Sequence, residues 1–188
     1  IPSERILPQY NLSDFQSFAR DQLMERDAPI PIGELFDQFD DETNSLTRPQ
    51  ATHQLNRNAD DIFVPLSRGE YGLSEWVIAD LLKLAEAGYF HSAENDSELP
   101  PVRQLWFPLF EARSLLVRSG MHCPAGDWGT STIRLAKILN SDIRHRFQVY
   151  FSDKDDIGPI IVAQEAIMYS EPIRHHSEFY PDFLDGYG

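Results

Sequence analysis

The sequence predicts a helix-rich α+β fold with a small sheet. Most apolar segments repeat at the three- and four-residue spacing of helices, whereas the clearest alternating segment, residues 145–152, has the two-residue spacing of a strand. A chain of 188 residues can bury about 70% of its surface on folding. We therefore expect a single globular domain over residues 1–188, which needs neither disulfides nor metals to fold.

The first helix is predicted from its cap. Ser13 and Gln16 have the spacing of a capping box, and apolar residues then recur at helical spacing as far as about Arg26. The prolines of residues 28–31 end this helix because neither can extend it. A short helix over residues 33–41 follows.

The next part of the chain is polar. We expect residues 43–61 to form a long polar loop, or a partly ordered helix over residues 49–58. A short apolar run at residues 62–66 predicts a strand or an extended tether. The strongest helix signal comes next, with Ser74 as its cap and Gly88 as its end.

Further elements follow toward the C-terminus. Residues 91–101 predict an exposed acidic turn, and residues 108–120 predict a helix with a proline in its first turn. Residues 121–129 predict a compact loop, after which Thr130 or Ser131 caps another helix.

The end of the chain combines the strand at residues 145–152 with two further segments. Residues 155–167 predict a final helix with apolar residues inward. Residues 172–188 form an aromatic tail, which either packs on the domain's own surface or presents anchors to a partner. The aromatic residues of the tail are Phe179, Tyr180, Phe183 and Tyr187.

Charge is unevenly distributed along the chain. The formal net charge is −14, with 19 acids and 7 bases in residues 1–100 and 11 acids and 9 bases in residues 101–188. This balance argues against general nucleic-acid binding, which depends on cationic contacts with phosphates. It favours an acidic binding module that docks a basic protein partner, as an inhibitor, an immunity-type partner or an assembly adaptor would. The residues expected to bind this partner are Asp37, Asp40, Asp41 and Glu42.

An alternative function is a cysteine-dependent hydrolase or transferase. Cys123 precedes His175 or His176 and then Asp182, which is the chain order of a Cys-His-Asp site. In such a site the imidazole takes the thiol proton and the carboxylate orients the imidazole. A third alternative is a structural subunit of a virus or a larger assembly.

The loop after Cys123 also suggests an anion site. Gly129, Thr130, Ser131 and Arg134 combine bare backbone amides, hydroxyls and a cation near a predicted helix start. A nucleotide P-loop is excluded because no lysine precedes the threonine.

Residues 29–60 can also be interpreted as a helix-turn-helix, with helices over residues 33–41 and 49–58. Five side chains of its second helix could contact base edges: Gln50, Thr52, His53, Asn56 and Arg57. The acids of the first helix oppose DNA binding, so we expect this polar helix to recognise a protein. No cofactor or metal is expected, because the sequence has no recognisable ligand spacing.

The sequence also bears on location. Its longest apolar run is far shorter than the ~20 residues that a bilayer requires. The first ten residues lack the regions of a signal peptide, so we expect none to be retained. We expect a cytoplasmic protein.

Overall fold

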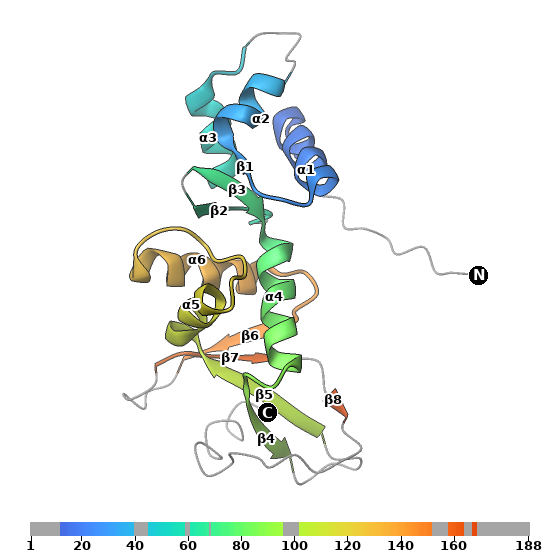
Figure 1. The fold of residues 1–188 in the computed structure, drawn as a ribbon, viewed down its shortest axis with the longest axis vertical. Coiled ribbons are helices and arrows are strands. Elements are labelled where there is room, and N and C mark those ends of the chain that lie inside the picture. Colours follow the sequence, from blue (N-terminus) through green and yellow to red (C-terminus); the bar gives the residue numbers. More distant parts are fainter. Residues whose placement is uncertain are drawn as a thin grey trace, which may run out of the picture.

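The chain builds two lobes, each with its own antiparallel sheet (Figure 1). The computed structural model describes residues 12–39, 45–58, 61–67, 69–95, 102–151, 158–163 and 167–168. The six helices and eight strands of this part confirm the predicted helix-rich α+β class. We call residues 12–73 the N-terminal lobe and residues 74–168 the C-terminal lobe.

The N-terminal lobe consists of three helices and a three-stranded sheet with the strand order β1-β3-β2. Ile30 pairs with Tyr71 across β1 and β3, and Phe63 pairs with Leu73 across β2 and β3. Its elements in chain order are α1 (Asp14–Arg26), β1 (Ile30–Pro31), α2 (Ile32–Gln38), α3 (Arg48–Asn56), β2 (Phe63–Ser67) and β3 (Glu70–Leu73).

Two of these helices begin with capping boxes. In α1 the Ser13 hydroxyl accepts a hydrogen bond from Gln16 N and the Gln16 side chain accepts one from Ser13 N, as the sequence predicts. In α3 Thr47 and Gln50 make the same pair of bonds. Each box satisfies two amides that the helix itself leaves unpaired. The segment predicted as a polar loop or partial helix, residues 43–61, therefore contains α3.

The C-terminal lobe places three helices against a sheet with the order β4-β5-β7-β6, and β8 pairs with β5. The strand predicted near residues 145–152 is confirmed as β6. The elements are α4 (Ser74–Glu86), β4 (His91–Asn95), β5 (Val102–Pro108), α5 (Leu109–Arg118), α6 (Trp128–Ser141), β6 (Phe147–Tyr150), β7 (Ile160–Ala163) and β8 (Ile167–Met168).

Two predictions about this lobe are wrong. Residues 160–163 form strand β7 between β5 and β6 instead of part of a helix, because this short run of branched residues is buried as the centre of the sheet. Residues 91–95 form strand β4, paired with β5, instead of an exposed turn. Two smaller corrections concern helix starts. Ser74 is the first residue of α4 and not its cap, since the N-cap is Leu73 and makes no side-chain hydrogen bond. The cap of α6 is Asp127 instead of Thr130 or Ser131.

Each lobe has its own hydrophobic core. Phe15, Leu23 and Leu55 belong to the N-terminal core, whereas Leu81 and Leu116 belong to the C-terminal core. The half-buried Trp76, in the first turn of α4, packs against both cores. No helix in the described ranges is both long enough and apolar enough to span a bilayer.

Polar contacts also join the lobes. The amide of Ala125 donates to the carbonyl of Pro65 in β2 over 2.7 Å. The Ser141 hydroxyl at the end of α6 donates to Asp61 Oδ2 over 2.6 Å. The loop before α6 and the end of α6 thus hold the base of the N-terminal lobe.

Candidate functional site

The order of elements in the N-terminal lobe gives α3 a distinctive setting. α3 packs against α1, α2 and β2, and the β2–β3 hairpin follows it in the chain (Figure 1). Helix α2, helix α3 and a hairpin follow one another in this order, which is also the order of elements in a helix-turn-helix with an adjoining β-ribbon. The connection from Phe39 to Thr47 is longer than the three or four residues that are usual in such motifs.

One side of α3 is buried and the other faces solvent. Ala51 and Leu55 are fully buried in the N-terminal core. Residues four apart lie on the same face of a helix, so Ala51 and Leu55 mark the core side of α3, and His53 between them is exposed. We call the solvent side the outward face of α3, defined by Pro49, Gln50, His53, Gln54 and Arg57, of which all but the half-buried Gln54 are exposed.

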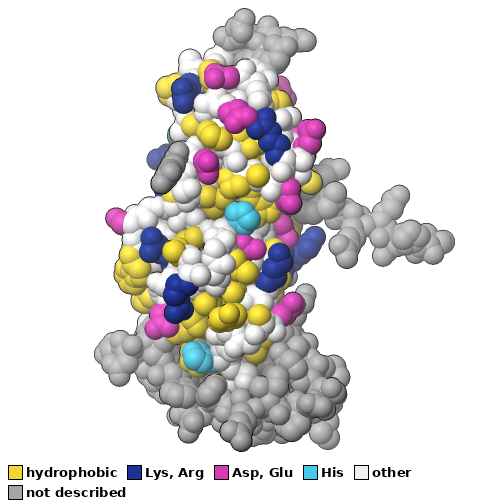
Figure 2. All heavy atoms as spheres, in the orientation of Figure 1, with side chains coloured by type: hydrophobic (Ala, Val, Ile, Leu, Met, Phe, Trp, Pro, Cys, Tyr) yellow, Lys and Arg dark blue, Asp and Glu magenta, His cyan; other side chains and the backbone are white. Residues whose placement is uncertain are grey.

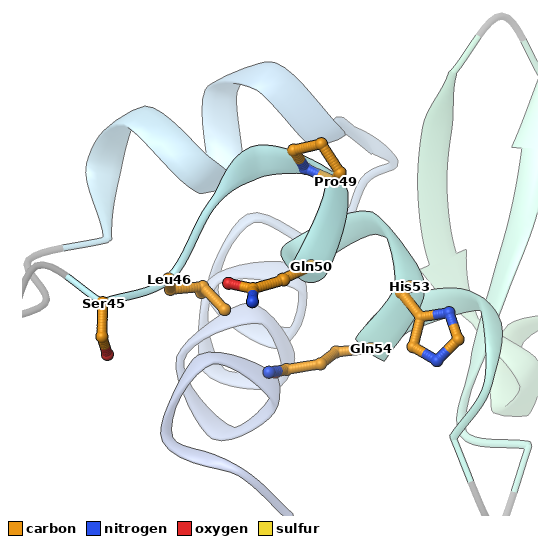
Figure 3. A pocket seen from close by; sticks show the side chains of 6 residues that line it. All are labelled: Ser45, Leu46, Pro49, Gln50, His53 and Gln54. Atoms are coloured by element: carbon orange, nitrogen blue, oxygen red, sulfur yellow. The ribbon is translucent and has the colours of Figure 1, made fainter.

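A shallow hollow runs along this face. Its volume is about 600 Å³, and Figure 3 shows the side chains of Gln50 and Gln54 extending from α3 on the same side as Leu46. The described lining residues are Ser45, Leu46, Pro49, Gln50, His53 and Gln54. The lining combines carboxamide, imidazole and hydroxyl groups with two apolar side chains.

Hydrogen bonds within the lobe position the two glutamines. Gln50 Oε1 accepts from the amide of Thr47 over 2.9 Å, and Gln54 Oε1 accepts from the Ser13 hydroxyl over 2.6 Å. Gln16 Nε2 donates to the backbone carbonyl of Gln54 over 2.8 Å. The N-terminus of α1 therefore braces the end of α3.

Two of the five predicted base-contacting side chains bond elsewhere. Thr52 donates to the carbonyl of Arg48 over 3.1 Å. Asn56 accepts from the Tyr71 hydroxyl over 2.6 Å, which ties α3 to the sheet. Sequence reasoning omitted Gln54, although it lies four residues after Gln50 and so shares its face.

The charge around α3 differs from that of the rest of the lobe. Residues 45–58 contain no Asp or Glu, but they contain Arg48 and Arg57. Both arginines are exposed, and neither has an ion-pair partner among the described residues. Arg48 extends toward Gly33 at the start of α2, where an added Cβ would lie 2.7 Å from its Nη2 atom. The outward face therefore carries hydrogen-bond donors, and residues 45–58 have no carboxylate that neutralises their arginines.

Exposed acids of this lobe lie on α1 and α2, and further described acids are Asp27, Asp61 and Glu70 of β3. Asp14, Asp21 and Glu25 are exposed and share one stripe of α1, because they are seven and four residues apart. Asp21 has a long contact with Arg20, 3.7 Å between charged atoms. Asp37 on α2 is exposed and has no ion pair within the described ranges. Three of the predicted partner-binding residues, Asp40, Asp41 and Glu42, lie outside the described residues.

The buried arginine of the C-terminal lobe, Arg146, forms its ion pairs within that lobe. Arg146 is buried, and it binds Asp142 over 3.0 Å as well as Glu75. The hydrogen bond to Glu75 is the main reason that the pKa of Arg146 is raised. Burial acts to raise the pKa of Asp142, but hydrogen bonds from Arg146 outweigh this effect and lower it. This group therefore does not neutralise the acids of the N-terminal lobe.

Lys137 is one cation of this lobe that reaches toward the N-terminal lobe, with its Nζ atom 3.9 Å from Asp61 Oδ1. On the face shown in Figure 2, acidic and basic side chains are interspersed over both lobes, with hydrophobic side chains between them. The acids on this face do not form one continuous patch.

Cys123 lies in the loop between α5 and α6. Its Sγ atom lies 3.8 Å from the Ser131 hydroxyl and near the carbonyl oxygens of Arg113 and Pro124. Burial raises the pKa of the Cys123 thiol above its ordinary value, which disfavours the thiolate. The other three residues of the predicted site, His175, His176 and Asp182, lie outside the described residues.

The same loop contains a histidine–aspartate contact, between His122 and Asp80, that the sequence does not predict. His122 Nδ1 lies 2.8 Å from Asp80 Oδ2, and the amide of His122 donates to the same oxygen over 2.9 Å. The imidazole also packs on Trp76, with ring centroids 5.2 Å apart. Because Asp80 and His122 are 42 residues apart, no local pattern in the sequence indicates this pair.

The residues of the predicted anion site are close together at the start of α6. The Asp127 side chain accepts from the amide of Thr130 over 2.8 Å, and this bond is the main reason that the pKa of Asp127 is lowered. The Ser131 hydroxyl donates to the carbonyl of Pro124 over 2.5 Å, and Arg134 donates to the carbonyl of Ala125. A carboxylate of the chain itself thus caps the helix beside Gly129.

Among the described residues, no group of three or more His, Cys, Asp or Glu side chains is arranged to hold a metal ion. Comparison of the chain with protein-family models, with curated proteins and with solved structures finds no match.

Proposed function

We propose that the N-terminal lobe binds duplex DNA, with α3 in the major groove and the β2–β3 hairpin beside it. The observation that carries this proposal is the outward face of α3, which is exposed, free of acids and rich in hydrogen-bond donors. In helix-turn-helix proteins the second helix lies in the major groove while the first crosses the backbone. Here α3 is the second helix and α2 the first.

The side chains on this face have suitable chemistry. Carboxamides and guanidinium groups are the side chains that most often hydrogen-bond to base edges. Gln50 and Arg57 are exposed on the side of α3 away from Leu55, whereas the half-buried Gln54 faces α1, where its carboxamide accepts from Ser13. The two exposed arginines at its ends are available to phosphates on either side of the groove.

The overall acidity limits the strength of this binding. A protein with a net charge of −14 gains little from general attraction to phosphates. We therefore expect weak non-specific binding, together with sequence preference from contacts in the groove. With Arg48 and Arg57 as the phosphate contacts, log K against log salt has a slope of about −2.

The test uses the full chain and a library of random duplexes. After selection, binding to an enriched duplex is measured by fluorescence anisotropy at several salt concentrations. We expect Arg57→Ala to weaken binding to all duplexes and to reduce the salt slope by about 1. The matched control is Arg118→Ala, an exposed arginine of α5 in the other lobe. Equal effects of the two substitutions, or no enriched duplex, would refute the proposal.

A second candidate is the acidic binding module that docks a basic protein partner. It is favoured by the exposed stripe of Asp14, Asp21 and Glu25 on α1 and by Asp37 on α2, which lacks an ion pair among the described residues. Electrostatic attraction of this kind mainly speeds association.

Charge reversal tests this second candidate. In the full chain, Asp37, Asp40 and Asp41 are replaced by lysine, and partners are captured at low and at physiological salt. The candidate requires partner binding to fall, and to fall more at low salt, where charges are less screened. Unchanged binding contradicts it. Both candidates include a cytoplasmic location, which suits a chain with one cysteine.

A further inference from the structure

We infer that the exposed face of α5 binds a second copy of this chain, with the two α5 helices antiparallel. This inference goes beyond the proposed DNA binding and does not depend on it, because α5 lies in the other lobe. All but one of the exposed large hydrophobic side chains in the described ranges belong to the C-terminal lobe, the exception being Met24. Exposed apolar side chains that lie together, unlike scattered ones, indicate an interaction site.

Two aromatic rings and a valine form the apolar part of this face. Phe110 and Val117 are exposed and lie seven residues apart, so they share one side of α5, which we call the apolar stripe. The exposed ring of Trp128 lies beside Phe110, with ring centroids 5.1 Å apart, and its indole donates to the carbonyl of Phe110 over 3.3 Å. α5 packs on α6, β5 and β7 through its other side, so the apolar stripe is left exposed.

Two opposite charges lie beside the apolar stripe. Glu111 and Arg118 are exposed and also lie seven residues apart, and we call them the charged stripe. Neither forms an ion pair with another described residue. The exposed Ser114 lies between the two stripes and midway along both of them. The face therefore has an acid near the start of α5, a base near its end and a small residue at its centre.

This pattern is complementary to itself about a two-fold axis. In a two-fold dimer both copies use the same patch, so that residue i contacts j and j contacts i. When two antiparallel α5 helices cross at Ser114, Phe110 of each copy meets Val117 of the other. In the same arrangement Glu111 of each copy meets Arg118 of the other.

The parallel arrangement lacks this complementarity. A two-fold axis along the helices would place the apolar stripe of each copy against the charged stripe of the other, which buries charges without partners. The antiparallel arrangement instead pairs apolar with apolar side chains and acid with base. The charge pattern of the face thus favours a second copy as its occupant and determines the orientation of that copy.

The size of this face limits the strength of the association. One helix face with a neighbouring ring buries less than the about 1,200 Å² of a typical stable interface. The net charge of −14 on each copy adds repulsion between them. We therefore expect a weak dimer, with a dissociation constant roughly in the micromolar range.

Sedimentation velocity of the full chain in the absence of DNA tests this inference. We expect the mean mass to rise toward twice that of the chain as the concentration is raised. Glu111→Arg and Arg118→Glu each place like charges opposite one another at two points of the dimer, so we expect each to weaken association about 10-fold or more. The double variant restores opposite charges, and we expect its association to return to within about threefold of the wild-type value.

The matched control is Glu86→Arg, at an exposed position of α4. It makes the same change in net charge as Glu111→Arg but lies outside the face, and we expect it to leave association unchanged. Circular dichroism and thermal unfolding verify that every variant folds, because the exchanged charges oppose the dipole of α5.

A cross-link tests the position of the two-fold axis. In a Cys123→Ala background, which removes the only cysteine of the chain, Ser114→Cys places two thiols opposite one another between the copies. We expect oxidised glutathione to convert this variant to a disulfide-linked dimer. The control Ser119→Cys is exposed at the end of α5, where the two copies lie about 15 Å apart along the helices. That separation exceeds the reach of a disulfide, so we expect little cross-linking.

The outcomes separate this inference from the proposed function, because none of these measurements contains DNA. A chain that stays monomeric at every concentration overturns the inference and leaves DNA binding untouched. A dimer that neither charge reversal weakens, or that Ser119→Cys cross-links better than Ser114→Cys, uses another surface and also overturns it. One copy can bind DNA through α3 without the dimer, so Arg118→Ala remains a control for the contacts of α3.

Discussion

α1 and α3 begin with the same capping device but present different surfaces to solvent. In α1 the capping residue Gln16 turns its amide nitrogen back to α3, and the exposed stripe of the helix is acidic. In α3 the corresponding residue, Gln50, uses its oxygen in the cap, and the exposed face contains no acid. The same capping box therefore begins one helix that braces the lobe and another that exposes hydrogen-bond donors to solvent.

The difference follows from what lies beside each helix start. α1 reaches the end of α3, so both atoms of the Gln16 carboxamide have partners within the lobe. Gln50 lines the hollow of about 600 Å³, and within the described ranges its amide nitrogen has no hydrogen-bond acceptor. A capping motif in a sequence predicts a helix start, whereas its second function depends on its tertiary neighbours.

The largest expected loss of stability comes from shortening a buried leucine of each helix in the shared core. Leu23 of α1 and Leu55 of α3 are both fully buried in the N-terminal core. Replacing either by alanine removes three buried side-chain carbons and leaves a cavity, so we expect each variant to lose about 2–5 kcal/mol of unfolding free energy. Urea denaturation measures this loss.

Hydrogen exchange then distinguishes the two helices. We expect Leu55→Ala to lower amide protection mainly in α3, and Leu23→Ala mainly in α1. If the two variants gave the same exchange pattern, the lobe would open as one unit and the distinction between a bracing helix and an exposed helix would not extend to stability.

A smaller effect is expected from the caps themselves. Ser13→Ala removes the acceptor for Gln16 N, at 3.1 Å, and the donor to Gln54, at 2.6 Å. Thr47→Ala removes one acceptor, with a longer bond of 3.4 Å to Gln50 N. We expect losses of about 1–2 kcal/mol for Ser13→Ala and about 0.5–1 kcal/mol for Thr47→Ala. Thermal unfolding ranks the two variants, and the reverse order would show that the bond to Gln54 contributes nothing.

Local signals in the sequence account for much of this fold. The box of Ser13 and Gln16 predicts the start of α1, because both partners lie within four residues. α3 was predicted to start at residue 49 instead of Arg48, and its cap Thr47 was missed. Strands β4 and β7 were missed because their hydrogen-bonding partners lie elsewhere in the chain, and pairing outweighs weak local preference.

The candidate site was only partly predictable for the same reason. The sequence identified Gln50, His53 and Arg57 as exposed polar residues, and all three lie on the outward face. It could not show that Asn56 bonds to Tyr71, or that Ser13 fixes Gln54, since these contacts join residues 15 and 41 positions apart. The charge of the sequence predicts one acidic surface for the N-terminal half, whereas the structure separates the acids of α1 from the acid-free face of α3.

The smallest effect is expected at alkaline pH and concerns the attachment of α3 to the sheet. The Tyr71 hydroxyl donates to Asn56 Oδ1, and burial raises the pKa of the phenol above its ordinary value of about 10. Because the folded-state pKa is raised, the stability that this group contributes is complete below the unfolded-state pKa and is lost as the pH rises through the folded-state value. α1 has no comparable bond to the sheet among the described residues.

Tyr71→Phe isolates this contribution, because it keeps the buried ring and removes the ionisable group. We expect the wild-type chain to lose more unfolding free energy between pH 9 and pH 11, a window chosen around the ordinary pKa of about 10, than Tyr71→Phe loses. Urea denaturation at each pH provides the difference, which cancels the titration of lysines and of the other tyrosines. Parallel pH profiles of the two proteins would mean that the phenol remains accessible to water, and that α3 is held to the sheet by its apolar contacts alone.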